Sequence, residues 1–341
     1  MWFTYRWQSP PVHTSSPGRK LGDHASAWVL ATFSTDGKLV GVSDDGGTRI
    51  YRASDGRLLR MFPAPFSTGQ FAFSLAISAT GLVAMGRVGG LDIHELDRAT
   101  EPLKYYCAGV CGPVSALAFS PNGAWLAYQA ARGAREPIPG LVNVVDLREH
   151  AMVAELEASS TRAGVMFAAD GRTLIAANVT RIDDGGTFGL RGWNGGAQWR
   201  RVRDDRGAQV PAGSIGPFAF DERVAAYSYD GRLEIRELSN SALVWSMPLV
   251  PPSLDAVVDA ASMRLELVAF ARHGDLVLTY ESPDGGSAPG TLVFRRMSDG
   301  TIVAMYDVAG VSALAIAPDG ESFVYSTGAG RTYTVVARVP R

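Results

Sequence analysis

The histidines, cysteines and Asp-Gly loops are the residues of this sequence that could do chemistry. A metal site needs several imidazole, thiolate or carboxylate ligands that converge, and a catalytic base needs a substrate proton within reach. Cys107 and Cys111 are four residues apart, without the second Cys or His pair of a zinc finger. The histidines lie far apart in the chain, at His13, His24, His94, His150 and His273. We therefore predict no catalytic residue, no metal site and no cofactor.

Three loops rich in Asp and Gly could in principle bind calcium. They read "SDDGGT" at 43–48, "IDDGGT" at 182–187 and "SPDGGS" at 282–287. A calcium loop of the helix–loop–helix type needs a fuller series of oxygen ligands that ends in Glu, and none of the three loops has it. Asp and Gly are also the residues that tight turns require, so we interpret these loops as turns.

Charge and hydropathy exclude two further classes of partner. The 341 residues carry 32 basic and 34 acidic side chains, a net charge of −2. Nucleic-acid binding normally needs a basic surplus, so we expect no nucleic-acid partner. No stretch approaches about 18 consecutive apolar residues, so we expect no membrane insertion and a cytoplasmic protein.

One short motif recurs along the whole chain and indicates how the fold is built. "FSPNG" at 119–123 returns as "FSTDG" from Phe33, "ISATG" from Ile77, "FAADG" from Phe167 and "IAPDG" from Ile316. The spacing is about 45 residues, a period typical of propeller repeats. One interval is about twice as long, and "FAFDE" at 218–222 fills its middle without the glycine. The period predicts seven units.

Each unit contains four short apolar segments separated by Gly and Asp turns. In the first unit they are "WVLATFS", "KLVGVS", "TRIYR" and "RLLRMF". Such spacing is typical of four-stranded antiparallel meanders. We predict an all-β, seven-bladed β-propeller in one domain over 1–341, closed by an N-terminal strand. The closing strand and lead-in take 1–25, and the blades take about 26–66, 67–110, 111–158, 159–212, 213–250, 264–308 and 309–341.

The last unit has three strand-like segments and then the chain ends. The segment "WFTYRW" at 2–7 is also strand-like and belongs to no other unit. A closed ring has no open sheet edge between its first and last units. We therefore predict that Trp2–Trp7 is the outer strand of blade seven.

Residues 21–62 resemble the WD-repeat β-propellers. His24 lies nine residues before Phe33, the offset of the histidine in that family, and Tyr51-Arg52 stands where Trp-Asp is typical. Other units depart from the pattern, with "VVDL" at 144–147 and "FRRM" at 294–297 in the Trp-Asp position. The resemblance implies a divergent propeller of bacterial type, held mainly by apolar packing between blades.

This resemblance implies a non-catalytic protein-interaction module or scaffold subunit of a bacterial assembly. The alternative is a lactonase-like or sialidase-like propeller that uses its central channel as an enzyme or as a binder of a small ligand or metal. That alternative needs convergent polar residues on the first strands, which carry mainly Ala, Ser, Val, Phe and Leu.

Candidate contact residues lie in the loops between the second and third strands. Arg and Tyr are enriched where protein interfaces gain most of their binding energy. The insertion "AARGAREPIPG" at 130–140 is longer than a turn requires. The predicted partner-binding residues are Arg87, Arg132, Arg135, Arg181 and Tyr229.

Overall fold

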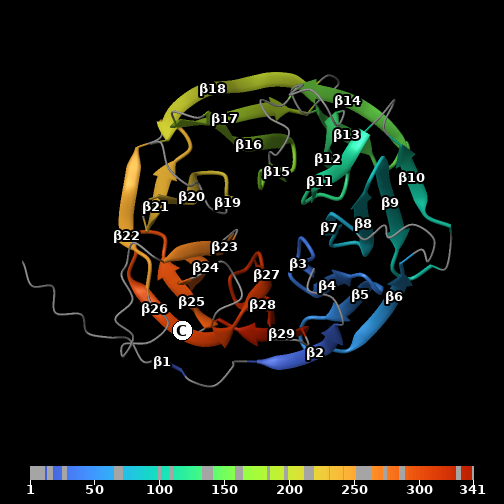
Figure 1. Ribbon diagram of the computed structural model, residues 1–341. Helices are drawn as coiled ribbons and strands as arrows, with labels where there is room; N and C mark the ends of the chain where they lie inside the picture. The colour runs from blue at the N-terminus through green and yellow to red at the C-terminus, as the bar shows by residue number, and fades with distance from the viewer. Residues whose placement is uncertain are drawn as a thin grey trace, which may run out of the picture.

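Seven β-sheets stand around a central axis like the blades of a propeller (Figure 1). The structure is a computed structural model that describes residues 12–13, 18–24, 29–64, 72–98, 101–106, 111–132, 141–157, 164–182, 185–195, 199–210, 219–229, 231–240, 242–250, 263–271, 275–283, 289–327 and 332–339. Every regular element in these ranges is a strand, and no helix in them is long and apolar enough to cross a membrane. The predicted all-β, seven-bladed propeller is confirmed.

Each blade runs from an inner strand beside the axis to an outer strand at the rim (Figure 1). Blades one and two consist of β3 (Leu30–Phe33), β4 (Leu39–Asp44), β5 (Gly47–Arg52) and β6 (Leu58–Pro63), then β7 (Ser74–Ile77), β8 (Leu82–Arg87), β9 (Gly90–Glu95) and β10 (Leu103–Tyr106). Blades three and four consist of β11 (Cys111–Phe119), β12 (Trp125–Arg132), β13 (Leu141–Asp146) and β14 (Ala151–Glu157), then β15 (Gly164–Phe167), β16 (Thr173–Ile182), β17 (Gly185–Asn194) and β18 (Arg200–Val210).

The remaining blades follow the same order. Blades five and six consist of β19 (Ala219–Phe220), β20 (Val224–Tyr229), β21 (Arg232–Glu237) and β22 (Leu243–Pro248), then β23 (Arg264–Phe270), β24 (Leu276–Ser282), β25 (Pro289–Arg296) and β26 (Ile302–Ala309). Blade seven has β27 (Val311–Ile316), β28 (Ser322–Thr327) and β29 (Thr332–Arg338) from the C-terminal part of the chain.

The recurring motif forms the turn between the first and second strands of a blade. In blade one, Ser34 Oγ donates a hydrogen bond to Asp36 Oδ1 at 2.7 Å and accepts one from Leu39 N at 3.0 Å. Gly37 closes the turn, with its N–H 2.9 Å from Ser34 O and a φ of 74°, a conformation that glycine adopts without steric cost. Ser120 and Asn122 make the same contacts in blade three. The motif repeats because every blade needs this reversal.

Blade five makes the turn without a glycine. Asp221 Oδ1 accepts hydrogen bonds from Arg223 N and Val224 N, both at 2.7 Å, and Asp221 N donates to Val224 O at 2.9 Å. This turn is tighter, so no residue at positive φ is required. The predicted hidden repeat at "FAFDE" is confirmed.

The strand that completes blade seven differs from the predicted one. β2 (Arg19–His24) pairs antiparallel with β29, so the outer position predicted for Trp2–Trp7 is filled by Arg19–His24. Residues 2–7 lie outside the described residues. β1 (Val12–His13) instead pairs in parallel with β26, as a fifth strand on blade six. An N-terminal strand therefore closes the ring, but it comes later in the chain than predicted.

The core consists of apolar layers between neighbouring blades. Phe294 of blade six and Phe323 of blade seven meet edge to face, with ring centroids 4.9 Å apart. Ile50 of blade one packs in one cluster with Ile77 of blade two. Burying a side chain of this size stabilises the fold by about 1.5–3 kcal/mol. These layers agree with the apolar packing between blades that the resemblance implied.

Candidate functional site

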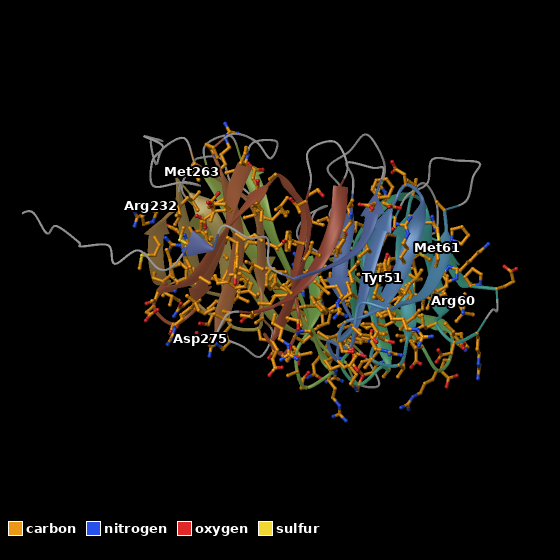
Figure 2. All side chains as sticks on the ribbon, turned by 90° about the horizontal axis from the view of Figure 1, so that it is seen from below. Tyr51, Arg60, Met61, Arg232, Met263 and Asp275 are labelled. Carbon is orange, nitrogen blue, oxygen red and sulfur yellow. The ribbon has the colours of Figure 1, made fainter. Side chains whose placement is uncertain are left out.

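The ring has two faces with different connections. The turns between first and second strands and between third and fourth strands lie on one face, here called the turn face. The connections between second and third strands and between successive blades lie on the other, here called the loop face. Figure 2 shows Asp275 at the turn face, and Arg232 and Met263 at the loop face.

The predicted contact residues lie toward the loop face in four consecutive blades. Arg87, Arg132 and Tyr229 are the last residues of β8, β12 and β20, and Arg181 is next to last in β16. Each of these strands runs from the turn face to the loop face. Arg135 lies outside the described residues, and for Arg132, Arg181 and Tyr229 the structure describes the strand position only.

Arg87 is engaged within its own blade. Its Nε donates to Asp92 Oδ2 at 2.7 Å, and the two side chains are only 14% and 20% exposed. Asp44 and Arg49 form the equivalent pair in blade one at 2.8 Å. A partner that contacts Arg87 therefore meets an arginine already held in place by an ion pair.

The second and third strands of blade four are longer than those of blades three, five and one. β16 and β17 have 10 residues each and β18 has 11, whereas β4, β5 and β6 of blade one have 6 each. All of these second strands start just after the turn, so the extra residues lie at the loop-face end. At about 3.3 Å per residue, the second and third strands of blade four reach roughly 13 Å farther. The described residues of the "TRIDDGG" insertion, 180–182 and 185–186, therefore belong to strands β16 and β17.

The central channel has an apolar cavity of about 260 Å³ at its turn-face end. The ends of the first strands line it, with Leu117, Met166, Phe220 and Phe270 half-buried there. The one carboxylate in this lining, Asp221, already accepts two backbone hydrogen bonds. The cavity thus offers an apolar surface and no convergent pair of acid and base groups among the described residues.

Where the structure describes them, His94 and the first Asp-Gly loop make contacts with neighbouring residues. His94 is half-buried, with its ring centroid 4.6 Å from that of Phe62, and burial lowers its pKa. In the loop at 43–48, Asp44 Oδ1 accepts a hydrogen bond from Gly46 N at 2.9 Å, which is the predicted turn role. Residues 183–184 and 284–288 of the other two loops lie outside the described residues. Within the described part of the chain, no group of three or more His, Cys, Asp or Glu side chains could hold a metal ion.

A charged cleft that the sequence did not indicate lies where blades seven and one meet. Its volume is about 820 Å³, and its lining includes Arg19, Lys38, Arg52 and Arg338 together with Asp36, Asp319 and Glu321. Lys38 pairs with Asp36 at 3.0 Å, and Arg52 pairs with Asp55 at 2.9 Å. The cleft depends on β2, because Arg19 from this strand donates to Asp55 O.

Comparison with solved structures places this ring among known propellers. A chain of the mitotic checkpoint complex superposes with a TM-score of 0.63 at 13% identity, covering 100% of both chains. The WD40 repeats of RRP9 give 0.68 at 16% identity, covering 96% of this chain and 99% of that one. U3-55K gives 0.66 at 16% identity over 94% and 99%. The chain has the fold of WD40 propellers. No protein-family model and no curated protein matches the sequence.

Proposed function

We propose that the protein is a non-catalytic interaction module that docks a protein partner on its loop face. The observation that carries this proposal is the asymmetry of that face, where blade four extends about 13 Å beyond a blade of ordinary strand length. The second strands of the neighbouring blades are shorter, with 8 residues in β12 and 6 in β20 against 10 in β16. An extension that projects beyond the described strands of its neighbours contributes less to the packing of the ring than to a binding surface.

Two further features support an interaction module over a channel enzyme. The turn-face end of the channel is lined mainly by apolar side chains, and the one carboxylate among its described lining residues accepts hydrogen bonds from backbone donors. One similar chain comes from the mitotic checkpoint complex, which is a protein assembly, and another is a set of WD40 repeats. A shared fold supports a function by analogy only, so the proposal depends on the loop face of this chain.

The proposed contact residues are those that the sequence indicated, together with the blade-four extension. Arg181 lies in that extension, and Arg132 and Arg135 flank or occupy the insertion of blade three. Arg87 lies on blade two, next to blade three, and Tyr229 lies on blade five, next to blade four. We further propose that residues 1–341 form one propeller domain that works in the bacterial cytoplasm as a scaffold subunit.

The test is to shorten each projection at a cross-strand pair and measure partner binding. Replacing 180–187 by Asn-Gly keeps the pair Val179–Phe188, and replacing 131–140 by Asn-Gly keeps the pair Ala130–Leu141. The partner is first captured with the tagged full-length protein, and its dissociation constant is then measured. We expect at least tenfold weaker binding by one or both variants, which is about 1.4 kcal/mol, at an unchanged melting temperature. Full affinity in the double variant would reject the loop face as the docking surface.

A further inference from the structure

The turn-face end of the axial channel has the size and chemistry to hold one large apolar side chain. The cavity measures about 260 Å³. An apolar protein cavity of about 150 Å³ is known to hold a benzene ring, so a Leu, Met or Phe side chain fits. Thr35, Asp221 and Pro318, which belong to the turns, also line it, so the cavity reaches the surface of the turn face.

Acidic turns surround this opening. The seven turns between first and second strands span 34–38, 78–81, 120–124, 168–172, 221–223, 271–275 and 317–321. They carry seven carboxylates: Asp36, Asp170, Asp221, Glu222, Asp275, Asp319 and Glu321. The described residues of these turns include three basic side chains, Lys38, Arg172 and Arg223. Asp36, Asp319 and Glu321 also line the cleft between blades seven and one, where Arg19, Arg52 and Arg338 lie. The described residues of the seven turns therefore carry four more carboxylates than basic side chains, although only Asp221 of these carboxylates lines the cavity itself. Apolar cavity walls strengthen the negative potential that such an excess creates.

Hydrogen bonds from neutral donors hold several of these carboxylates in place without cancelling their charge. Asp275 accepts from Ser298 N and Ser298 Oγ, both at 2.9 Å. Glu222 accepts from the backbone N–H of Ala169 in the neighbouring blade. Burial works to raise the pKa of Asp170, but hydrogen bonds from Thr173 and the backbone outweigh it and lower that pKa. These hydrogen bonds hold the three carboxylates at fixed positions, and the lowered pKa of Asp170 favours its charged form.

We propose that this opening binds a basic segment of a partner protein, which inserts one large apolar side chain into the axial cavity. The apolar cavity supplies an anchor of the kind that dominates peptide recognition, and the acidic rim selects Lys or Arg on either side of it. The site is separate from the loop face, so it is a second docking surface on the opposite side of the ring.

The acidic side chains of the rim also disfavour two other occupants of the cavity, a second copy of this chain and a small apolar ligand. A second copy of this chain that docked turn face to turn face would bring two acidic rims together, which costs free energy. A small apolar ligand would fill the cavity but would leave the acidic rim without a counterpart. A basic segment with an apolar anchor is the occupant that uses both features.

Fluorescence anisotropy with a labelled synthetic peptide tests this site on the full-length protein. The probe is a peptide of about nine residues with Phe at its centre and lysines on both sides, and the comparison peptide has Gly in place of Phe. We expect the Phe peptide to bind at least tenfold more tightly than the Gly peptide. We also expect binding to weaken as the salt concentration rises, because the rim is exposed.

Matched variants separate the rim from general surface charge. The triple variant Asp170→Asn, Asp275→Asn and Glu321→Gln removes three exposed carboxylates around the axis. The control Glu101→Gln, Glu149→Gln and Glu237→Gln removes three exposed carboxylates from the outer turns of the same face. We expect the first to weaken binding of the Phe peptide at least fivefold, and the control to weaken it less than twofold.

A cavity-filling variant completes the test. Met166→Trp enlarges a half-buried side chain of the cavity lining. This variant should weaken binding of the Phe peptide and leave binding of the Gly peptide unchanged. Equal binding of the two peptides, or equal loss in the two triple variants, would overturn the proposal in favour of non-specific charge attraction. Absence of binding at millimolar peptide would overturn it outright, as would self-association of the protein that the peptide competes away.

Discussion

Arg295 and Glu281 form an ion pair inside blade six, with side chains 1% and 0% exposed. The guanidinium Nη2 donates to Glu281 Oε2 at 3.2 Å, and Nη1 donates to Oε1 of the same carboxylate and to Thr279 Oγ1 at 3.0 Å. Glu281 Oε2 also accepts from Val250 N at 2.5 Å, so the pair ties the connection from blade five to the second strand of blade six. This buried ion pair and its hydrogen bonds therefore add polar contacts to the apolar packing between blades.

Removing one member of this pair should destabilise the ring strongly. In Arg295→Met, the carboxylate of Glu281 stays buried without its countercharge, a situation that costs about 3–5 kcal/mol. The double variant Arg295→Met with Glu281→Leu removes both charges and should recover most of that loss. Urea unfolding followed by circular dichroism measures both. A double variant less stable than Arg295→Met would show that the pair itself stabilises the blade.

Ring closure should depend on β2 and not on the residues before it. Leu21 packs in one cluster with Tyr51 of blade one and Val336 of blade seven, and Arg19 contacts Asp55 O. Deleting 1–24 exposes the edge of β29, so we expect aggregation or a melting temperature lower by more than about 5 °C. Deleting 1–11 leaves β1 and β2 in the chain and should change the melting temperature little. The point variant Leu21→Asp should act in the same direction as the longer deletion.

The position of β2 shows why the sequence predicted the blades but not the closing strand. Glycines at positive φ and alternating apolar residues are local signals, and they recur in each blade, so the count of seven was readable. An outer strand needs few apolar residues, and "RKLGDH" at 19–24 has only Leu21 to bury. "WFTYRW" at 2–7 has the stronger strand pattern. Only the spatial neighbours of Leu21 reveal which segment completes the blade.

The sequence predicted the candidate surfaces to different degrees. The sequence placed Arg87 and Arg181 in the loops between second and third strands, whereas the structure places them at the loop-face ends of β8 and β16. The sequence did not show the ion pair of Arg87 with Asp92, because that contact depends on the register of β8 and β9. It also missed the acidic rim, since that rim collects one or two residues from each of several turns about 45 residues apart.

Arg60 should be a stabilising link between blades one and two. Its Nη1 donates to the carbonyl oxygens of Glu95, Leu96 and Arg98 at 3.1, 2.6 and 2.8 Å, and Figure 2 shows it on the outer strand of blade one beside Met61. Arg60→Met leaves these carbonyls without their donor, so we expect a loss of about 1–3 kcal/mol in the free energy of unfolding. The control Arg98→Met removes an exposed arginine paired with Glu95 at 3.3 Å and should cost less than about 1 kcal/mol. Equal losses would mean that the Arg60 contacts contribute no more than a surface charge.

Protonation of His94 should weaken the fold as the pH falls. Burial lowers the pKa of His94, and together with the nearby charges of Arg87, Arg60 and Lys104 it outweighs the opposing effect of Asp92. The unfolded chain therefore binds a proton near pH 6.5 more readily than the folded chain does, so the free energy of unfolding decreases as pH falls through this region.

The check is a pair of single-histidine variants compared across pH. His94→Gln removes the half-buried imidazole, and His150→Asn removes an exposed one in the turn of blade three, where Asn tolerates the φ of 53°. Thermal unfolding is measured between about pH 5 and pH 8. We expect His94→Gln to flatten the decrease in melting temperature at low pH, and His150→Asn to leave it as in the unmodified protein. An unchanged pH dependence in His94→Gln would show that other groups account for it, because the lowered pKa of His94 requires the proton uptake on unfolding that this variant removes.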